Sequence, residues 1–332
     1  MTARARLILT LALPALVFYG RAGAEPPARL TAGYSTNTAG QSVLWIANDA
    51  GLYQKNGREV KLVFVQSAFL MTQALIAGDL PVAAMGGGGA VTSNLAGSDL
   101  VIVASLAKSP NLNYLVTRKE ITRPEQLKGK RLGVARLGGA SDSILRLALK
   151  KTGLDPDRDA TILQIGLSPA RIRALEAGAI DGTILTVEER AAANPLGVNV
   201  LLDLRTLGVE FLSNDLVTSR KFVRENGETV RSFMKAVVEG IHYYKTQKGR
   251  AMGIMSRYMR GADPKTIEVG YDFNADVYQH KPYPSEEGVR LALQEAAPKN
   301  PKAAAAGPER FSDDRFVREL DQSGFIDRLY RN

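Results

Sequence analysis

The residues best suited to chemistry in this sequence are glycines that follow a predicted strand. Gly86-Gly87-Gly88-Gly89 comes after a short apolar run, and Ala90 begins a helix-like segment. Glycines let a ligand reach main-chain N–H groups at the start of a helix, where the partial positive charge favours anionic or strongly polar groups. The stretch lacks the Gly-Lys-Ser/Thr ending of a phosphate loop, so nucleotide binding is not expected. We expect ligand contacts from Gly87, Gly88, Gly89 and Ala90.

A second stretch, Gly138-Gly139-Ala140-Ser141, also follows a predicted strand and begins a helix, and we interpret it as the counterpart of the first. Gly139, Ala140 and Ser141 are therefore candidate contacts, with the Ser141 hydroxyl as a donor or a cap. Ligands of open α/β sheets bind beyond the carboxyl ends of the strands. Further polar candidates at such ends or at a chain crossing are Ser35, Thr36, Gln41, Ser67, Thr186 and Asn214. The alternative for each is ordinary turn chemistry.

Residues arranged for catalysis are hard to find. The two histidines, His242 and His280, have no spacing typical of a metal site or a catalytic triad. Glu188-Glu189 and Asp313-Asp314 are adjacent pairs, which point apart on a helix, so we interpret them as solvated charge rather than as acid/base dyads. The chain has no cysteine. We therefore expect no enzyme activity, no catalytic residue, no metal and no cofactor.

The elements that must position the candidates repeat along the chain. Ala74-Leu75-x-Ala77-Gly78 returns as Ala174-Leu175-x-Ala177-Gly178, and each copy lies between two β-like runs. Each half reads β-α-β-α-β. Two such halves predict an α/β protein with two lobes and a ligand held in the cleft between them. Trp45 and Tyr271 could stack on that ligand, although the apolar helix face around Trp45 favours core packing.

The predicted organisation has four parts. Lobe one takes residues 25–115, lobe two takes 116–213, and the chain returns at 214–332 to lobe one and a set of C-terminal helices. Residues 1–24 form a secretory signal peptide, because a basic start (Arg4, Arg6) precedes 13 apolar residues and an Ala22-Gly23-Ala24 cleavage site. Cleavage is expected after Ala24. An N-terminal membrane anchor is the alternative.

The charge and the cysteine content narrow the expected partners and cellular location of the protein. Loss of Arg4, Arg6 and Arg21 with the leader lowers the formal charge from +9 by three, to +6. The basic residues are scattered, so nucleic acid is not an expected partner. A lipoprotein needs a cysteine after its signal, so we expect a free periplasmic protein and not a lipoprotein, and we expect a monomer.

Several segments in a fixed order carry a family resemblance. They are Ala47-Asn48-Asp49-Ala50-Gly51-Leu52-Tyr53 with Asn56-Gly57, Gln73-Ala74-Leu75-Ile76-Ala77-Gly78, Gln126-Leu127-Lys128-Gly129-Lys130-Arg131-Leu132-Gly133-Val134, and Phe222-Val223-Arg224-Glu225-Asn226 with Val230-Arg231-Ser232-Phe233. In these segments the chain resembles the solute-binding proteins of ABC transporters that take up nitrate, sulfonates, taurine and thiamine pyrimidine precursors.

The resemblance implies a type II periplasmic-binding-protein fold, with two hinge crossings between the lobes. It also implies capture of a small polar or anionic organic solute by hinge closure, and delivery to an inner-membrane ABC permease with its ATPase. Two alternatives stay open. One is an enzyme that resembles the thiamine-pyrimidine synthases, against which the leader and the lack of cysteine argue. The other is a ligand-sensing module for a membrane receptor.

Overall fold

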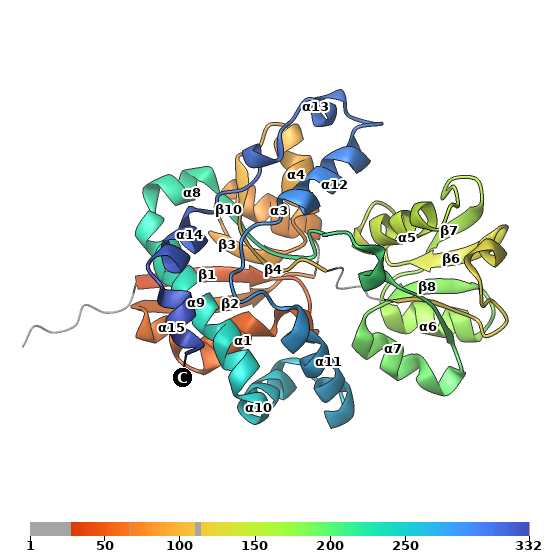
Figure 1. Ribbon diagram of the computed structural model, residues 1–332, viewed down its shortest axis with the longest axis horizontal. Helices are drawn as coiled ribbons and strands as arrows, with labels where there is room; N and C mark the ends of the chain where they lie inside the picture. Colours follow the sequence, from red (N-terminus) through yellow and green to blue (C-terminus); the bar gives the residue numbers. More distant parts are fainter. Residues whose placement is uncertain (1–27, 67, 110–113, 332) are drawn as a thin grey trace, which may run out of the picture.

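Two separate five-stranded sheets organise the protein (Figure 1). The computed structural model describes residues 28–66, 68–109 and 114–331. The expected signal peptide at residues 1–24 and the candidate Ser67 lie outside these residues. We call the first sheet with its helices lobe one, and the second sheet with its helices lobe two.

The sheet of lobe one is mixed. It has the order β2-β1-β3-β10-β4, in which β10 is antiparallel to both of its neighbours and the other strands run in the same direction. Its strands are β1 (Ala28–Tyr34), β2 (Arg58–Phe64), β3 (Val82–Met85), β4 (Leu100–Ala107) and β10 (Asn214–Ser219).

The sheet of lobe two repeats this plan. Its order is β7-β6-β8-β5-β9, and β5 is the antiparallel strand. The strands are β5 (Tyr114–Thr117), β6 (Lys130–Val134), β7 (Ala160–Gln164), β8 (Gly182–Leu185) and β9 (Asn199–Asp203). Position by position, β6, β7 and β8 therefore correspond to β1, β2 and β3.

The strand directions decide which edges of the two sheets face each other. The chain leaves lobe one after β4 and enters lobe two at β5, and it leaves lobe two after β9 and returns at β10. Because β4 and β9 run with the parallel strands and β5 and β10 run against them, both crossings join the carboxyl edge of one sheet to the carboxyl edge of the other. The loops that follow the parallel strands of both lobes therefore border one seam.

Helices cover both faces of each sheet. Lobe one has η1 (Ala39–Gln41), α1 (Ser42–Asp49), α2 (Leu52–Lys55), α3 (Ala68–Ala77) and α4 (Gly88–Leu95). Lobe two has η2 (Pro124–Leu127), α5 (Ala140–Lys151), α6 (Ser168–Glu176), α7 (Val187–Ala193), η3 (Asn194–Leu196) and η4 (Leu204–Leu207). No helix within the described ranges is long and apolar enough to cross a membrane.

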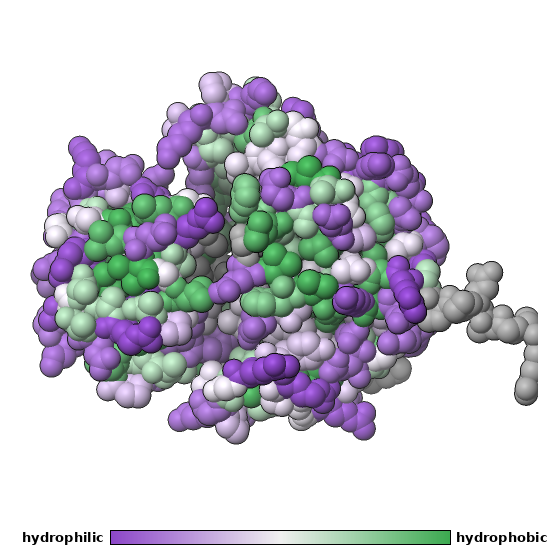
Figure 2. All heavy atoms as spheres, turned by 180° about the vertical axis from the view of Figure 1, so that it is seen from behind, coloured by the Kyte–Doolittle hydropathy of each residue, from purple (hydrophilic) through white to green (hydrophobic). Residues whose placement is uncertain are grey.

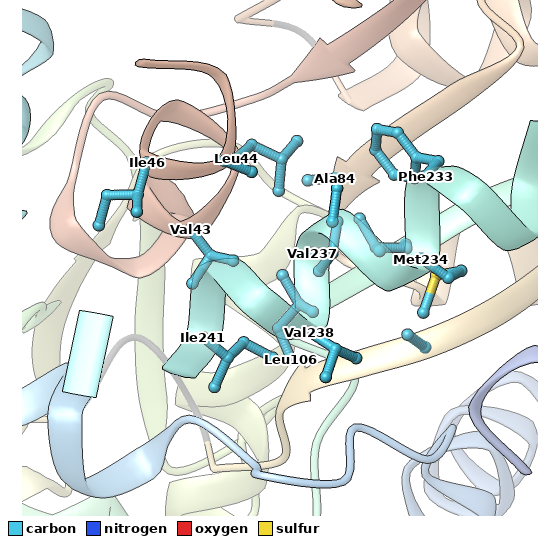
Figure 3. Packing of buried hydrophobic residues seen from close by; sticks show 14 of the residues in the cluster. Val43, Leu44, Ile46, Ala84, Leu106, Phe233, Met234, Val237, Val238 and Ile241 are labelled. Atoms are coloured by element: carbon cyan, nitrogen blue, oxygen red, sulfur yellow. The ribbon is translucent and has the colours of Figure 1, made fainter. Parts of the chain in front are cut away.

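The rest of the chain, after β10, forms helices that mostly enlarge lobe one. They are α8 (Arg220–Glu225), α9 (Gly227–Thr246), α10 (Lys248–Tyr258), α11 (Pro264–Val277), α12 (Glu286–Ala296), α13 (Pro301–Ala304), η5 (Pro308–Arg310), α14 (Arg315–Gln322) and α15 (Phe325–Leu329). The central one, α9, buries an apolar stripe at helical spacing against α1 and the sheet (Figure 3). Gly240 allows this close approach, since a Cβ there would lie 3.2 Å from the carbonyl oxygen of Val43.

The expected two-lobed α/β architecture is confirmed, and the repeat seen in the sequence is a structural repeat. The two copies of the Ala-Leu-x-Ala-Gly motif end α3 and α6, the equivalent helices of the two lobes. Gly78 and Gly178 each take the left-handed conformation beyond the helix, with φ of 83° and 68°, which residues other than glycine adopt only with strain.

Candidate functional site

The residues singled out by the sequence gather along the seam between the lobes. Lobe one contributes the β1–α1 loop, the β3–α4 loop and the first residue of β10, and lobe two contributes the β6–α5 and β8–α7 loops. Figure 2 shows a furrow between the two lobes with hydrophobic side chains on both of its sides. This is where ligands bind in open α/β sheets.

The side chain of Gln41 stabilises the conformation of the β1–α1 loop. Its Oε1 accepts hydrogen bonds from the main-chain N–H groups of Ser35 (2.8 Å) and Thr36 (3.1 Å). Its Nε2 donates to Ser35 Oγ (3.0 Å) and to the carbonyl oxygen of Ala84 in β3 (3.1 Å). An amide offers two donors and two acceptor lone pairs, so all four positions are filled within the protein. Gln41 therefore positions the loop that carries Ser35 and Thr36.

Three of the four loop glycines are closely packed by the protein itself, so a side chain there would crowd its neighbours. A Cβ on Gly87 would lie 3.0 Å from Asp215 Oδ2, one on Gly86 would lie 3.3 Å from the carbonyl oxygen of Leu212, and one on Gly89 would lie 3.2 Å from Thr72 Oγ1. At Gly88, the first residue of α4, nothing lies within 4 Å of the added atom. Gly88 is thus the glycine of this loop that borders open space.

A chain of hydrogen bonds, buried except at its end on Glu210, connects the glycine loop to the return crossing. Gly87 N donates to Asp215 Oδ2 (3.0 Å), and Ser105 Oγ donates to Asp215 Oδ1 (2.5 Å). Ser285 N then donates to Ser105 Oγ (3.0 Å), and Ser285 Oγ donates to Glu210 Oε2 (2.5 Å). Burial raises the pKa of Asp215 to about 7, although both hydrogen bonds oppose the shift. Asp215 was not among the predicted residues.

Ser141 has a comparable positioning role in lobe two. Its Oγ accepts a hydrogen bond from Ala135 N (2.9 Å), six residues earlier, as the Oε1 of Gln41 does from Ser35 N. Gly139 is the N-cap of α5, and Ala140 is its first residue. Among the described residues, Ser141 Oγ has this accepted hydrogen bond and no donated one, so a solute contact from Ser141 remains a prediction.

Replacing Ser141 by alanine should lower the free energy of unfolding by about 1 kcal/mol, because the partly buried main-chain N–H of Ala135 loses its acceptor. Urea denaturation of the two proteins measures the difference. Ser143→Ala, in the same turn of α5, is the matched control and should change stability less. Equal midpoints for wild type and Ser141→Ala would contradict the positioning role.

The interpretation of Gly138-Gly139-Ala140-Ser141 as the counterpart of the four-glycine loop is wrong. The four-glycine loop follows β3, whose equivalent is β8, while the Gly138–Ser141 stretch follows β6, whose equivalent is β1. Both stretches follow a strand and begin a helix. That local pattern does not reveal the position in the sheet of the strand that each stretch follows. The true counterpart of the four-glycine loop is the β8–α7 loop with Thr186.

The β8–α7 loop brings a carboxylate from lobe two into lobe one. Thr186 caps α7 by accepting from Glu189 N (3.2 Å), and Thr186 N donates back to Glu189 Oε2 (3.0 Å). Glu188 is only 6% exposed, and its Oε1 accepts from Ala39 N of lobe one (3.2 Å). Gly270 in α11 makes room for this carboxylate, since a Cβ there would lie 2.6 Å from Glu188 Oε1.

The expectation that Glu188 and Glu189 are solvated is therefore wrong. Glu189 closes the cap on Thr186 and lies 3.6 Å from Arg171 Nη2, and burial raises the pKa of Glu188. Adjacent acids do point apart on a helix, but these two lie in its first turn, where one meets the cap and the other meets the opposite lobe. The sequence signal for the cap was available in the spacing of Thr186 and Glu189; the contact across the seam had none.

Asn214 lies at the junction of the return crossing and β10. Its Nδ2 donates to the carbonyl oxygen of Gly40. Its Oδ1 is buried and has no hydrogen-bond partner among the described residues. A buried acceptor without a partner is costly, so a donor from a bound molecule would stabilise it.

The two aromatic residues considered for stacking on a ligand belong to the core. Trp45 is fully buried and stacks on Tyr258 at 4.8 Å between ring centroids, which confirms the core assignment. Tyr271 stacks on Tyr244 at 4.6 Å. Within the described parts of the chain, no group of three His, Cys, Asp or Glu side chains could hold a metal ion.

A groove of about 510 Å³ lies elsewhere along the seam, between α5 and α12. Its wall includes Lys150, Glu210, Arg290 and Glu295, and none of the predicted site residues lines it. The loops that carry the predicted site residues and this groove are thus different surfaces.

Comparisons with known proteins agree with the fold. A family model described as NMT1/THI5 like matches residues 39–251. The taurine-binding periplasmic protein of Escherichia coli K12 is 27% identical over 258 residues, which cover 74% of this chain and 73% of that protein.

Two solved structures show the same fold. The periplasmic aliphatic sulphonate binding protein SsuA from Escherichia coli has a TM-score of 0.69 at 21% identity, with 84% of this chain and 94% of that chain covered. The periplasmic nitrate-binding protein NrtA from Synechocystis PCC 6803 has a TM-score of 0.67 at 14% identity, with 92% and 91% covered. The expected periplasmic-binding-protein fold is therefore confirmed.

Proposed function

The chain belongs to the NMT1/THI5-like family, and on that premise we propose that it is the solute-binding receptor of an ABC importer. It captures a small polar or anionic organic solute between its lobes and delivers it to an inner-membrane permease with its ATPase. The taurine-binding relative and the sulphonate- and nitrate-binding structures support this assignment. We further propose that residues 1–24 direct export and that the mature chain is a periplasmic monomer.

The observation that carries the proposal is the unfilled space and the unpartnered polar atom that the described part of lobe one presents beside the seam. Gly88 borders open space at the first residue of α4, and Asn214 Oδ1 is buried without a partner. Both are the first residues of elements of lobe one, α4 and β10, and Ser141 and Thr186 lie across the seam in lobe two. A solute that hydrogen-bonds to both lobes binds the closed state better and shifts the population toward it.

A thermal-shift screen of the mature protein tests the proposal, because a ligand that binds only the folded state raises the unfolding midpoint by mass action. The protein is purified from the periplasm, where its N-terminus should read Glu25. Sulfonates, carboxylates, pyrimidines and nitrate form the panel, and hits are titrated by calorimetry. Small-angle scattering should show a smaller radius of gyration with the bound solute. If no member of the panel shifts the midpoint, the receptor assignment fails.

A further inference from the structure

Large apolar side chains are exposed where both lobes meet the seam. Among the described residues, the strongly exposed large hydrophobic side chains are Phe64, Phe69, Leu70, Ile76, Leu137 and Leu167. All except Ile76 lie at the carboxyl end of β2, in the first turn of α3, or in the loops that follow β6 and β7. Because the carboxyl edges of both sheets border one seam, these side chains come from both lobes toward the same cleft.

The ring of Phe64 is exposed on one side and packs on other aromatic rings on the opposite side. Phe64 pairs with Tyr34 in the sheet register, and the two ring centroids are 5.4 Å apart. Tyr34 in turn packs edge-on against Trp45 at 5.8 Å, and Trp45 stacks on Tyr258. This row of rings begins in the core and ends at Phe64, which is 40% exposed. The ring is therefore held in place while one side of it stays open to solvent.

The two equivalent helices show that the fold does not require an apolar surface here. α3 reads AFLMTQALIA and has no charged residue, and Phe69 in its first turn is 61% exposed. Its equivalent α6 reads SPARIRALE and exposes the charged side chains of Arg173 and Glu176, while Arg171 is buried. Both helices follow the second strand of their lobe and cover the same position of the sheet. The exposed apolar side chains of α3 are therefore not required by the fold, and they give this side of the cleft an apolar surface.

Two of the exposed apolar side chains, Phe64 and Leu137, adjoin loops of the proposed site. Phe64 adjoins Tyr34, the residue before Ser35, and Leu137, which is 50% exposed, directly precedes Gly138-Gly139-Ala140-Ser141. A pocket lined by hydrophobic side chains with a few placed polar groups is typical of sites for small organic ligands. We propose that the cleft binds an organic solute with a polar or anionic head and a sizeable aromatic or aliphatic group, which packs on Phe64, Phe69, Leu137 and Leu167. This inference rests on the receptor function proposed above.

Calorimetric titration with pairs of solutes that share a head group tests the inference. Suitable pairs are ethanesulfonate with hexanesulfonate, acetate with benzoate, and pyrimidine with a benzyl-substituted pyrimidine. The larger member should bind more tightly, by on the order of fourfold for each CH₂ that leaves water. If the smaller members bind as tightly as the larger ones, the inference is overturned and the receptor function stands. If no solute of either size binds, both are overturned.

Variants locate the apolar contact. Phe64→Ala and Leu137→Ala should each weaken the larger solute of a pair at least fivefold and leave the smaller one unchanged. Ile76→Ala removes an equally exposed apolar side chain at the other end of α3 and should change neither. Equal weakening of both solutes by Phe64→Ala and Leu137→Ala would show that these side chains only pack lobe against lobe on closure, and would overturn the inference. No effect on either solute would overturn it as well.

Discussion

Gly88→Leu is expected to weaken solute binding by roughly 100-fold or more while the protein keeps its fold, since forcing a large side chain into a closely packed contact costs about 3 kcal/mol. The added Cβ meets nothing within 4 Å in the protein, so the leucine side chain extends from the first residue of α4 into the space assigned to the solute. Leucine is also the better helix former, so the unfolding midpoint should be equal or slightly higher. Calorimetry measures the affinity, and circular dichroism during heating measures the midpoint.

Gly253→Leu is the matched control for this substitution. Gly253 lies in α10, is exposed, and also has nothing within 4 Å of an added Cβ. The control variant should bind solute with wild-type affinity. Wild-type affinity in Gly88→Leu would remove the β3–α4 loop from the binding site, and a lower midpoint would mean that the loop is more tightly packed than the distances indicate.

The sequence predicts the architecture well because its internal repeat corresponds to the repeat of the two lobes. Two copies of one motif, each between β-like runs, place α3 and α6 at equivalent positions, and the spacing of about 100 residues then orders the flanking strands. Helix-ending glycines such as Gly78 and Gly178 are local signals that need no tertiary information. These signals suffice for two lobes with a seam between them.

The contacts within the candidate site could not be predicted as well from the sequence. A glycine-rich loop after a strand looks the same after β3 and after β6, so the pairing of the loops needed the sheet order. Glu188 makes its defining contact with Ala39, 149 residues away and in the other lobe. Gln41 was identified from its position after a strand, but its four hydrogen bonds show that it orders the loop.

Asp215 is the exception, because a signal for it was present. A carboxylate between Asn214 and the apolar pair Leu216-Val217 of a strand must find buried partners, since an unpaired charge in such a place is very costly. The strand is fully buried at this point, and the partners are the loop glycine Gly87 and the core serine Ser105. The same carboxylate thus fixes the shape of the β3–α4 loop and faces the interior of lobe one.

Asp215→Asn is expected to remove a large part of the pH dependence of stability between about pH 4 and pH 7. In the folded chain the pKa of Asp215 is raised to about 7, above its ordinary value of 3.8, so between these pH values the folded protein holds a proton that the unfolded chain has released. Its contribution to stability is therefore complete below about pH 4 and is lost as the pH rises to about 7. A shift of this size corresponds to about 4 kcal/mol.

Urea denaturation of wild type and Asp215→Asn across pH 4 to 8 measures this contribution as the difference between two curves. The comparison is necessary because burial also raises the pKa of Glu188, which adds to the pH dependence in the same direction as Asp215. Asp49 and Asp203 do not add to it in this range, because hydrogen bonds from Arg257 and Arg205 hold their pKa values below 3.8 against partial burial, so their contribution to stability is complete above about pH 4. Asp79→Asn, at an exposed position, is the control and should give a curve parallel to wild type. Parallel curves for Asp215→Asn as well would mean that the carboxyl is ionised at pH 4 to 7 and that its bonds to Gly87 and Ser105 outweigh its burial. A flatter curve, by contrast, would establish that the loop bearing Gly88 is held by a group that changes charge near neutral pH.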